Sequence, residues 1–219
     1  MIRARRAELL RSFTVIHRRL PPTVRKQPHQ ERARVTMEAI IIAATRVIER
    51  DGLDRLTTTR IAEIAGVSIG SLYQYFDSRE AILGAIIDRQ LDAMLVSFRQ
   101  LVDALVALPL EAMVRGVLFG LLEASREHEK LHGPLYEEMS AARRNDCHAR
   151  TLDAYACIVA STLVARRDVA VADPQIAARL LVHASHGVIR ELVRADGSQA
   201  SDMLEESARM VVRYLARPN

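Results

Sequence analysis

Glycine, proline and cysteine are all scarce in this sequence. Nine glycines and seven prolines among 219 residues leave little room for long loops, although 49% hydrophobic and 26% charged residues is ordinary globular composition. The two cysteines, Cys147 and Cys157, lack a Cys-x-x-Cys or Cys/His ligand spacing. We therefore expect reduced thiols, and neither a structural disulfide nor a zinc site built on cysteine.

Long apolar runs and strand-like alternation are also missing. No apolar run reaches transmembrane length, and the basic N-terminus is not followed by the hydrophobic stretch of a signal peptide. We therefore expect a cytoplasmic, non-secreted protein without a membrane partner. Because polar and apolar residues nowhere alternate over a useful length, and no internal repeat occurs, the predicted fold class is all-α.

The charge that is present is mainly arginine. Lys and Arg number 31 against 27 Asp and Glu, which gives a net charge of +4 and favours polyanionic partners. Residues 1–31 form a basic N-terminal arm. Its first 30 residues contain eight lysines and arginines and a single acid, Glu8. Such an arm either follows a phosphate backbone and minor groove or is a solvated tail.

Helical periodicity begins near Arg32 and continues to the end of the chain. A first helix ends at Gly52, a second begins with Thr57 or Thr58 as N-cap and ends at Gly66, and a third begins after Ser68. The spacing of Asp77 and Glu80 predicts a capping box that opens the next helix. The remaining predicted helices are 78–107, 110–131, 134–139, 145–167, 174–194 and 201–216, with a break at Gly133-Pro134 among others.

The segment from Thr57 to Phe76 has the residue pattern of a helix-turn-helix. Ala62 permits close helix approach, Gly66 suits a turn with positive φ, Val67 seals the turn and Leu72 faces inward. Small residues after Ser68 would leave the first turn of the third helix free to approach base edges, and neighbouring hydroxyls and arginines suit phosphates. The predicted DNA-contacting residues are Arg34, Thr58, Thr59, Arg60, Ser68, Ile69, Gly70, Ser71, Tyr73, Gln74, Tyr75 and Arg79.

The runs TTTRIA (57–62), AGVSIGSLYQYF (65–76) and DSREAIL (77–83) resemble the TetR-type transcriptional regulators. The resemblance covers residues 32–92, with arginine at position 79 where the family usually has lysine. It implies a DNA-binding domain at 32–92 and a ligand-binding and dimerisation domain at 93–219. It further implies a homodimer that binds a palindromic operator on double-stranded DNA, usually as a repressor. A small-molecule effector is then expected to release this homodimer from the DNA.

The same resemblance assigns the last two helices to a dimer interface. Their apolar stripes either face a second subunit or serve an intramolecular core; the candidate interface residues are Leu180, Ala184, Gly187, Val188, Leu204, Val211 and Leu215. Candidates for the effector pocket are Phe98, Met113, Tyr136 and Tyr155, with ordinary core packing as the alternative. His183 and His186 are expected to be hydrogen-bonded histidines near the dimer helices rather than ligands or pH sensors. No cofactor is expected beyond an effector of unknown identity.

Two patterns typical of enzymes also occur. His128, Glu129 and His132 match the H-E-x-x-H zinc motif, but the predicted helix end at Gly133-Pro134 and the charged flanks favour a solvated helix terminus. Ser68 lies in a G-x-S-x-G match, but a helix leads into it where a nucleophile elbow needs a strand. We therefore expect no catalytic residue and no metal. A zinc-dependent hydrolase and a basic helical module that binds RNA or anionic membrane stay as alternatives.

Overall fold

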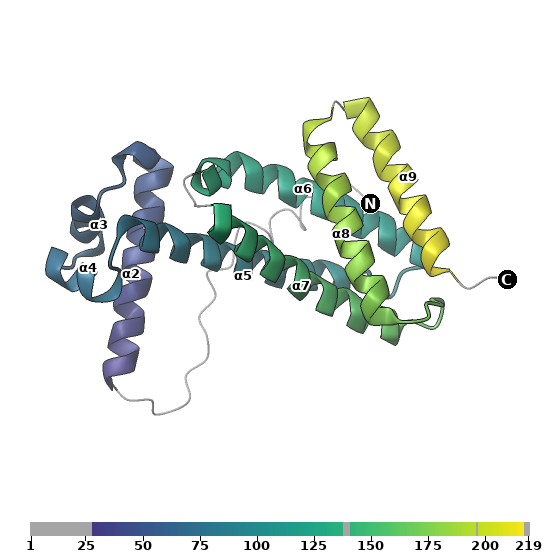
Figure 1. Cartoon of the computed structure of the whole chain (residues 1–219), viewed down its shortest axis with the longest axis horizontal. Coiled ribbons are helices and arrows are strands. Elements are labelled where there is room, and N and C mark those ends of the chain that lie inside the picture. Colours follow the sequence, from purple (N-terminus) through teal and green to yellow (C-terminus); the bar gives the residue numbers. More distant parts are fainter. Residues whose placement is uncertain (1–27, 138–140, 196, 217–219) are drawn as a thin grey trace.

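The computed structural model describes residues 28–137, 141–195 and 197–216, and these form an all-α protein (Figure 1). Side chains are described for these residues except 28–30, 130–134, 136–137, 141–143 and 197–198. The described part contains no strand, only an isolated antiparallel bridge between Val169 and Ala216. None of its helices combines the length and apolar character needed to cross a bilayer.

The helices divide into a small head and a longer body. The head consists of α2 (Pro28–Asp51), the short 3-10 helix η1 (Leu53–Arg55), α3 (Thr58–Ala65), α4 (Ile69–Tyr75) and the first part of α5 (Arg79–Leu105). The body contains the rest of α5 with α6 (Leu110–Glu137), α7 (Ala141–Ala165), α8 (Pro174–Arg194) and α9 (Gly197–Leu215). The head and the α8–α9 pair lie at opposite ends of the molecule (Figure 1).

Several helices begin where local sequence signals predict. Thr57 and Ser68 accept hydrogen bonds from the backbone N–H groups of Arg60 and Ser71, and Asp173 caps α8 ahead of Pro174. The cap of α5 is Ser78 and not Asp77, because Ser78 has the extended backbone that lets its hydroxyl accept from the N–H of Ala81. That prediction was one residue early.

The predicted helix break at Gly133-Pro134 is wrong. The backbone of α6 continues through both residues to Glu137, so the separate helix predicted at 134–139 does not exist. A proline inside a helix costs about 3 kcal/mol or more. Leu135, directly after the proline, is buried in the head core, and such packing offsets that cost.

The head and the body have separate apolar cores, and α5, α6 and α7 contribute to both. Ile40, Val47, Ile61, Leu72 and other buried side chains form the head core, which also receives Leu135 from α6 and Cys147 from α7. The first turns of α5 contribute to this core, while Phe98 and Val102 farther along α5 belong to a body cluster. The predicted boundary between residues 92 and 93 therefore falls inside one continuous helix.

Candidate functional site

A tight turn between α3 and α4 sets the geometry of the head. Gly66 has φ 69° and ψ 31°, a left-handed conformation that glycine adopts without a steric penalty. The N–H groups of Gly66 and Val67 both donate to carbonyl oxygens near the end of α3, including that of Ala62. Ala62 and Leu72 are buried, so the two helices cross at close range. The four residues predicted to hold the motif together all lie at this crossing.

One side of α4 is exposed while the other is buried in the head core. Ser68, Ile69, Gly70, Tyr73 and Gln74 face solvent, with Tyr73 51% exposed. Ser71 and Tyr75 are half-buried at the margin of this surface. The Tyr73 hydroxyl lies 3.2 Å from the Thr58 hydroxyl of α3. This surface joins the first turns of both short helices, and it offers hydroxyl, amide and backbone N–H groups to a partner.

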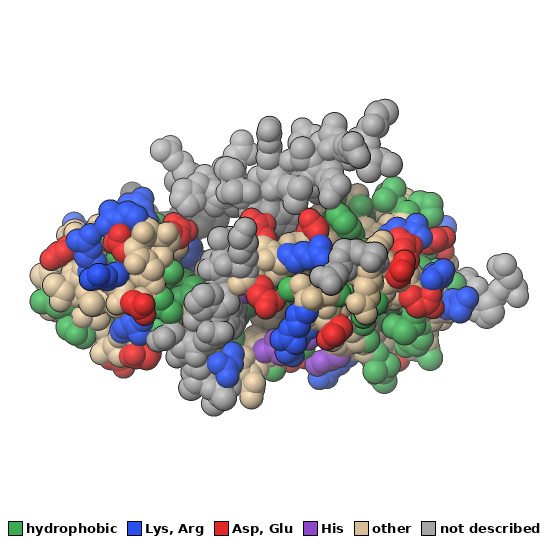
Figure 2. Space-filling view, turned by 90° about the horizontal axis from the view of Figure 1, so that it is seen from above, with side chains coloured by type: hydrophobic (Ala, Val, Ile, Leu, Met, Phe, Trp, Pro, Cys, Tyr) green, Lys and Arg blue, Asp and Glu red, His purple; other side chains and the backbone are tan. Residues whose placement is uncertain are grey.

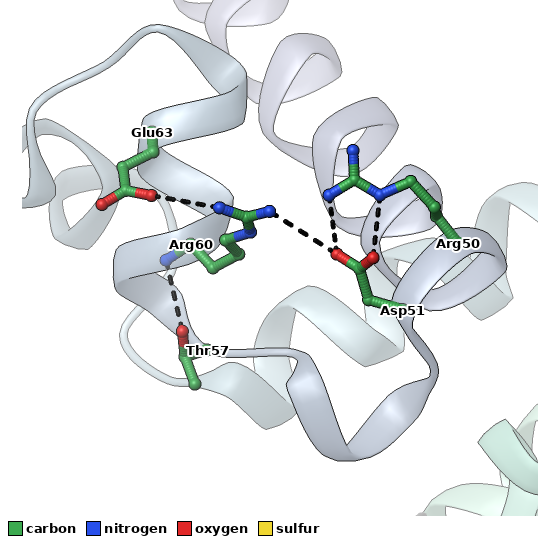
Figure 3. Close-up of polar contacts among 5 residues, drawn as sticks. All are labelled: Arg50, Asp51, Thr57, Arg60 and Glu63. Carbon is green, nitrogen blue, oxygen red and sulfur yellow. Dashed lines mark hydrogen bonds and ion pairs between the residues drawn. The ribbon is translucent and has the colours of Figure 1, made fainter.

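Arg60 stands at the edge of this surface between two carboxylates (Figure 3). Its guanidinium nitrogens lie 3.7 Å from an oxygen of Asp51 and 3.7 Å from one of Glu63. The hydrogen bond from Arg50 is the main cause that lowers the pKa of Asp51, and Arg60 adds to it. Exposed ion pairs of this length contribute about 1 kcal/mol at most. They orient Arg60 but leave it able to exchange a carboxylate for a phosphate.

Arg79 and Arg34 occupy different surroundings. Arg79 is half-buried, and its guanidinium donates to the backbone carbonyls of Leu56 (3.0 Å) and Leu53 (3.2 Å). It therefore ties the start of α5 to η1, a role that sequence reasoning missed because a carbonyl acceptor has no sequence signature. Arg34 is exposed on α2 and pairs with Glu31 at 2.7 Å. Contact of either arginine with DNA stays a prediction.

The body holds a cavity of about 820 Å³, bordered by α5, α6, α7 and α8 with Val211 and Leu215 of α9. Phe98, Met113 and Tyr155, three of the four candidate pocket residues, line it. The rings of Phe98 and Tyr155 pack with their centroids 4.5 Å apart. Most of this lining is apolar. The side chain of the fourth candidate, Tyr136, lies outside the described residues.

One corner of the cavity is polar and basic. The rings of His148 on α7 and His186 on α8 meet edge to face, with centroids 4.2 Å apart. Burial lowers the pKa of His186 to about 4, and the positive charges of His148, Arg190 and His183 act in the same direction. The pKa of His148 is lowered for the same reasons, burial first. His186 thus lines a cavity, whereas the sequence predicted a hydrogen-bonded histidine near the dimer helices. Its contact with His148 depends on the packing of α7 against α8.

The predicted dimer residues separate into two groups. On α8, Leu180 is 58% exposed, Ala184 and Gly187 face solvent and Val188 is half-buried. On α9, by contrast, Leu204, Val211 and Leu215 are buried in the body core. The expectation that these three face a second subunit is corrected: the intramolecular alternative holds, since this side of α9 packs within the chain. The large apolar side chains exposed on α9 are Met210 (52%) and Tyr214 (46%).

The two enzyme-like patterns have simple structural settings. Ser68 is an N-cap whose hydroxyl also lies 2.8 Å from that of Ser71, and a helix precedes it. His128 and Glu129 lie on α6, whereas the side chain of His132 is outside the described residues. Among the residues that are described, no three His, Cys, Asp or Glu side chains lie close enough to hold a metal ion.

Known proteins share both halves of the chain. A family model for the tetR family of bacterial regulatory proteins matches residues 40–86, and one for the tetracyclin repressor-like C-terminal domain matches residues 109–215. Nucleoid occlusion factor SlmA of Actinobacillus pleuropneumoniae is 38% identical over 72 residues, which cover 32% of this chain and 34% of SlmA. The HTH-type transcriptional repressor KstR2 of Mycolicibacterium smegmatis is 31% identical over 127 residues, 58% of each chain.

The match thus spans 34% of the length of SlmA and 58% of that of KstR2. Among solved structures, FadR of Thermus thermophilus, a TetR-family transcriptional repressor in complex with lauroyl-CoA, superposes with a TM-score of 0.53 at 19% identity. That match covers 84% of this chain and 96% of FadR, and at such low identity it establishes the fold alone. With the two family models on consecutive parts of the chain and this arrangement of helices, the protein belongs to the TetR family of bacterial regulatory proteins.

Proposed function

We propose that this chain is a DNA-binding transcriptional repressor that binds a palindromic operator as a homodimer and is released by a small molecule. The observation that carries the proposal is the exposed side of the capped helix α4. The N-terminal residues of the second helix in a helix-turn-helix read base edges in the major groove. Here those residues are Ile69, Gly70 and Ser71, and Gly70 has no side chain to keep the backbone away from the floor of the groove.

The surrounding side chains suit the two kinds of DNA contact. Tyr73 and Gln74 extend hydroxyl and amide groups from the exposed side of α4, where they can reach base edges or sugar-phosphate. Thr58, Thr59 and Arg60 at the start of α3 offer two hydroxyls and a cation to the flanking phosphates. The basic arm of residues 1–31 adds positive charge, although residues 1–27 lie outside the described part of the chain. Binding is therefore expected to weaken steeply with salt.

The proposed dimer uses the exposed apolar residues at the far end of the body. Ile176 and Leu180 on α8 are each 58% exposed, and Met210 and Tyr214 lie exposed on α9. Hydrophobic side chains gather at this end of the molecule (Figure 2). A Cβ added at Gly187 would meet no atom within 4 Å, so this part of α8 leaves room for close approach of a partner helix. Such a pairing would present two α4 helices to two half-sites.

The cavity supports the effector part of the proposal. Its volume of about 820 Å³ is within the range of small-molecule sites, roughly 300–1,000 Å³. The FadR structure, which has the same fold, holds lauroyl-CoA. Because α5 lines the cavity and also enters the head core, a ligand that alters the position of α5 also alters that of α4. We propose that this shift separates the two heads from their half-sites.

The experiment that tests this function is selection of bound duplexes from a random DNA pool with the full-length chain. The enriched duplex is then titrated at 50 and 200 mM salt. A palindrome bound by two subunits, with affinity that falls as salt rises, supports the proposal. If no sequence is enriched and binding follows charge alone, the sequence-reading role of α4 is wrong, and the basic helical module becomes the better description.

A further inference from the structure

The basic corner of the cavity contains arginines without carboxylate partners. His186, Arg190 and Arg194 follow one another at four-residue spacing on α8, so they share the side of that helix that borders the cavity. Among the described residues, no Asp or Glu oxygen lies within 4.0 Å of the guanidinium of Arg190 or Arg194. Two exposed cations therefore border the cavity, and neither forms an ion pair with another described residue.

Arg166, at the opposite end of the cavity, is an arginine whose guanidinium is paired within the chain. Its guanidinium forms a bidentate ion pair with Asp168 and donates to the carbonyls of Val106 and Leu108. The side chain is 8% exposed, and it closes the space between α7 and the loop before α6. Arg166 is thus part of the scaffold, whereas Arg190 has no such bonds among the described residues.

The histidines respond to the same excess of positive charge. Burial is the main cause that lowers the pKa of both His148 and His186; the Arg190 charge acts in the same direction, and no acid raises either pKa. Glu127 and Glu129 on α6 also border the cavity; like Arg190 and Arg194 they are exposed, and neither glutamate is among the causes that shift the pKa of these two histidines. This corner is therefore arranged to receive negative charge from outside the chain.

The other end of the cavity gives a charged ligand no free partner, because Arg166 there is already paired with Asp168. Phe98, Leu101, Val102, Met113, Val114 and Leu118 are all buried, and they line the space between α5 and α6. A charged group placed among them would lose its hydration without gaining a partner, which costs several kcal/mol. A ligand that fills the cavity must consequently be apolar at this end, with its charge at the α7–α8 end.

We propose that the effector is an amphiphile whose anionic head, a carboxylate or a phosphate, binds at Arg190, His186 and His148. Its apolar chain then lies between α5 and α6. An anion in this corner pairs with Arg190 and accepts a hydrogen bond from an imidazole N–H, since a neutral histidine still has one donor. The proposal depends on the proposed function only where it calls the bound molecule the effector. Binding of the amphiphile itself can be tested without DNA.

The test is calorimetric titration of the full-length protein with four probes: decanoate, decyl phosphate, decanol and inorganic phosphate. The first three share one chain and differ in the head, so their comparison isolates the charge. We expect decanoate or decyl phosphate to bind at least about tenfold more tightly than decanol, equivalent to the roughly 1.4 kcal/mol or more that a charge-assisted hydrogen bond contributes. The stronger of the two anions identifies the head group, and inorganic phosphate alone should bind weakly because it lacks the chain.

Arg190→Gln should remove the preference for the anion while leaving decanol binding unchanged. The matched control is Arg179→Gln on the same helix, an exposed arginine that does not border the cavity and lies 3.7 Å from Asp153. The proposal would be overturned if neither decyl anion binds more tightly than decanol, if both variants lose equal affinity, or if neither decyl anion binds. Operator binding is measured separately: if it fails while the anion preference holds, the regulator function is wrong and the ligand site stands.

Discussion

Gly70 and Gly66 are both glycines of the helix-turn-helix, yet the same substitution should affect them in opposite ways. Gly70 lies in the first turn of α4, and a Cβ added there would meet only the Ser68 hydroxyl at 3.9 Å, an ordinary contact. Gly70→Ala should therefore raise the free energy of unfolding by about 0.5–1 kcal/mol, because alanine loses less backbone entropy in a helix. Gly66→Ala also meets no atom within 4 Å, but its φ of +69° is strained for alanine and should lower stability by about 1–2 kcal/mol.

DNA affinity should not follow stability at Gly70. If the first turn of α4 lies against the floor of the major groove, the added methyl group holds the helix away from the base edges. We expect the more stable Gly70→Ala variant to bind the selected duplex at least about tenfold more weakly, a loss of roughly 1.4 kcal/mol. Urea denaturation and fluorescence anisotropy measure the two quantities on the same preparation. A Gly70→Ala variant that binds as tightly as the parent refutes the placement of α4, and one that is less stable refutes the open surroundings of Gly70.

Three further predictions address Arg79, the half-buried imidazole of His186 and the dimer. Arg79→Lys keeps the charge but loses the paired bonds to the Leu53 and Leu56 carbonyls, so urea denaturation should show a loss of about 1–2 kcal/mol. Because the pKa of His186 is about 4 when folded and roughly 6.5 when unfolded, the unfolded chain binds more protons between these values. The contribution of neutral His186 to the free energy of unfolding should therefore be complete above about pH 6.5 and should decrease as the pH drops toward 4. His186→Gln should make this decrease smaller in pH-dependent thermal denaturation. Leu180→Glu places a charge on the proposed dimer surface and should yield monomers in sedimentation velocity, whereas Arg179→Glu, its neighbour, should leave the dimer intact; a dimeric Leu180→Glu protein contradicts the assigned interface.

Local signals in the sequence predicted the head well, because each depends on residues within one turn of a helix. The Thr57 and Ser68 caps and the left-handed Gly66 are of this kind, since a hydroxyl or a missing Cβ acts on the nearest backbone. The predicted helix break at Gly133-Pro134 was wrong for the opposite reason. The cost of a proline is local, but the burial of Leu135 in the head core, which offsets that cost, depends on tertiary packing.

Features that depend on tertiary packing could not be predicted in this way. An apolar stripe on α9 has the same spacing whether it faces α6 or a second subunit, so Leu204, Val211 and Leu215 could not be assigned from periodicity. The contact between His148 and His186 joins residues on different helices, and nothing in either local sequence indicates it. Candidate cavity residues were easier to find, because Phe98, Met113 and Tyr155 are large side chains on the inner faces of the body helices.

Because α5 is one continuous helix, a small tilt at its cavity end produces a larger displacement at its head end. At 27 residues it is about 40 Å long, with Ile82, Leu83 and Ile86 fixed in the head and Phe98, Leu101 and Val102 bordering the cavity. A tilt of about 5° about its cavity end moves its head end by about 3.5 Å, a tenth of the roughly 34 Å that separates successive major grooves on one side of a duplex. Under the release mechanism proposed above, a ligand that displaces the side chains around Phe98 by only a fraction of an ångström would move α4 out of register with its half-site.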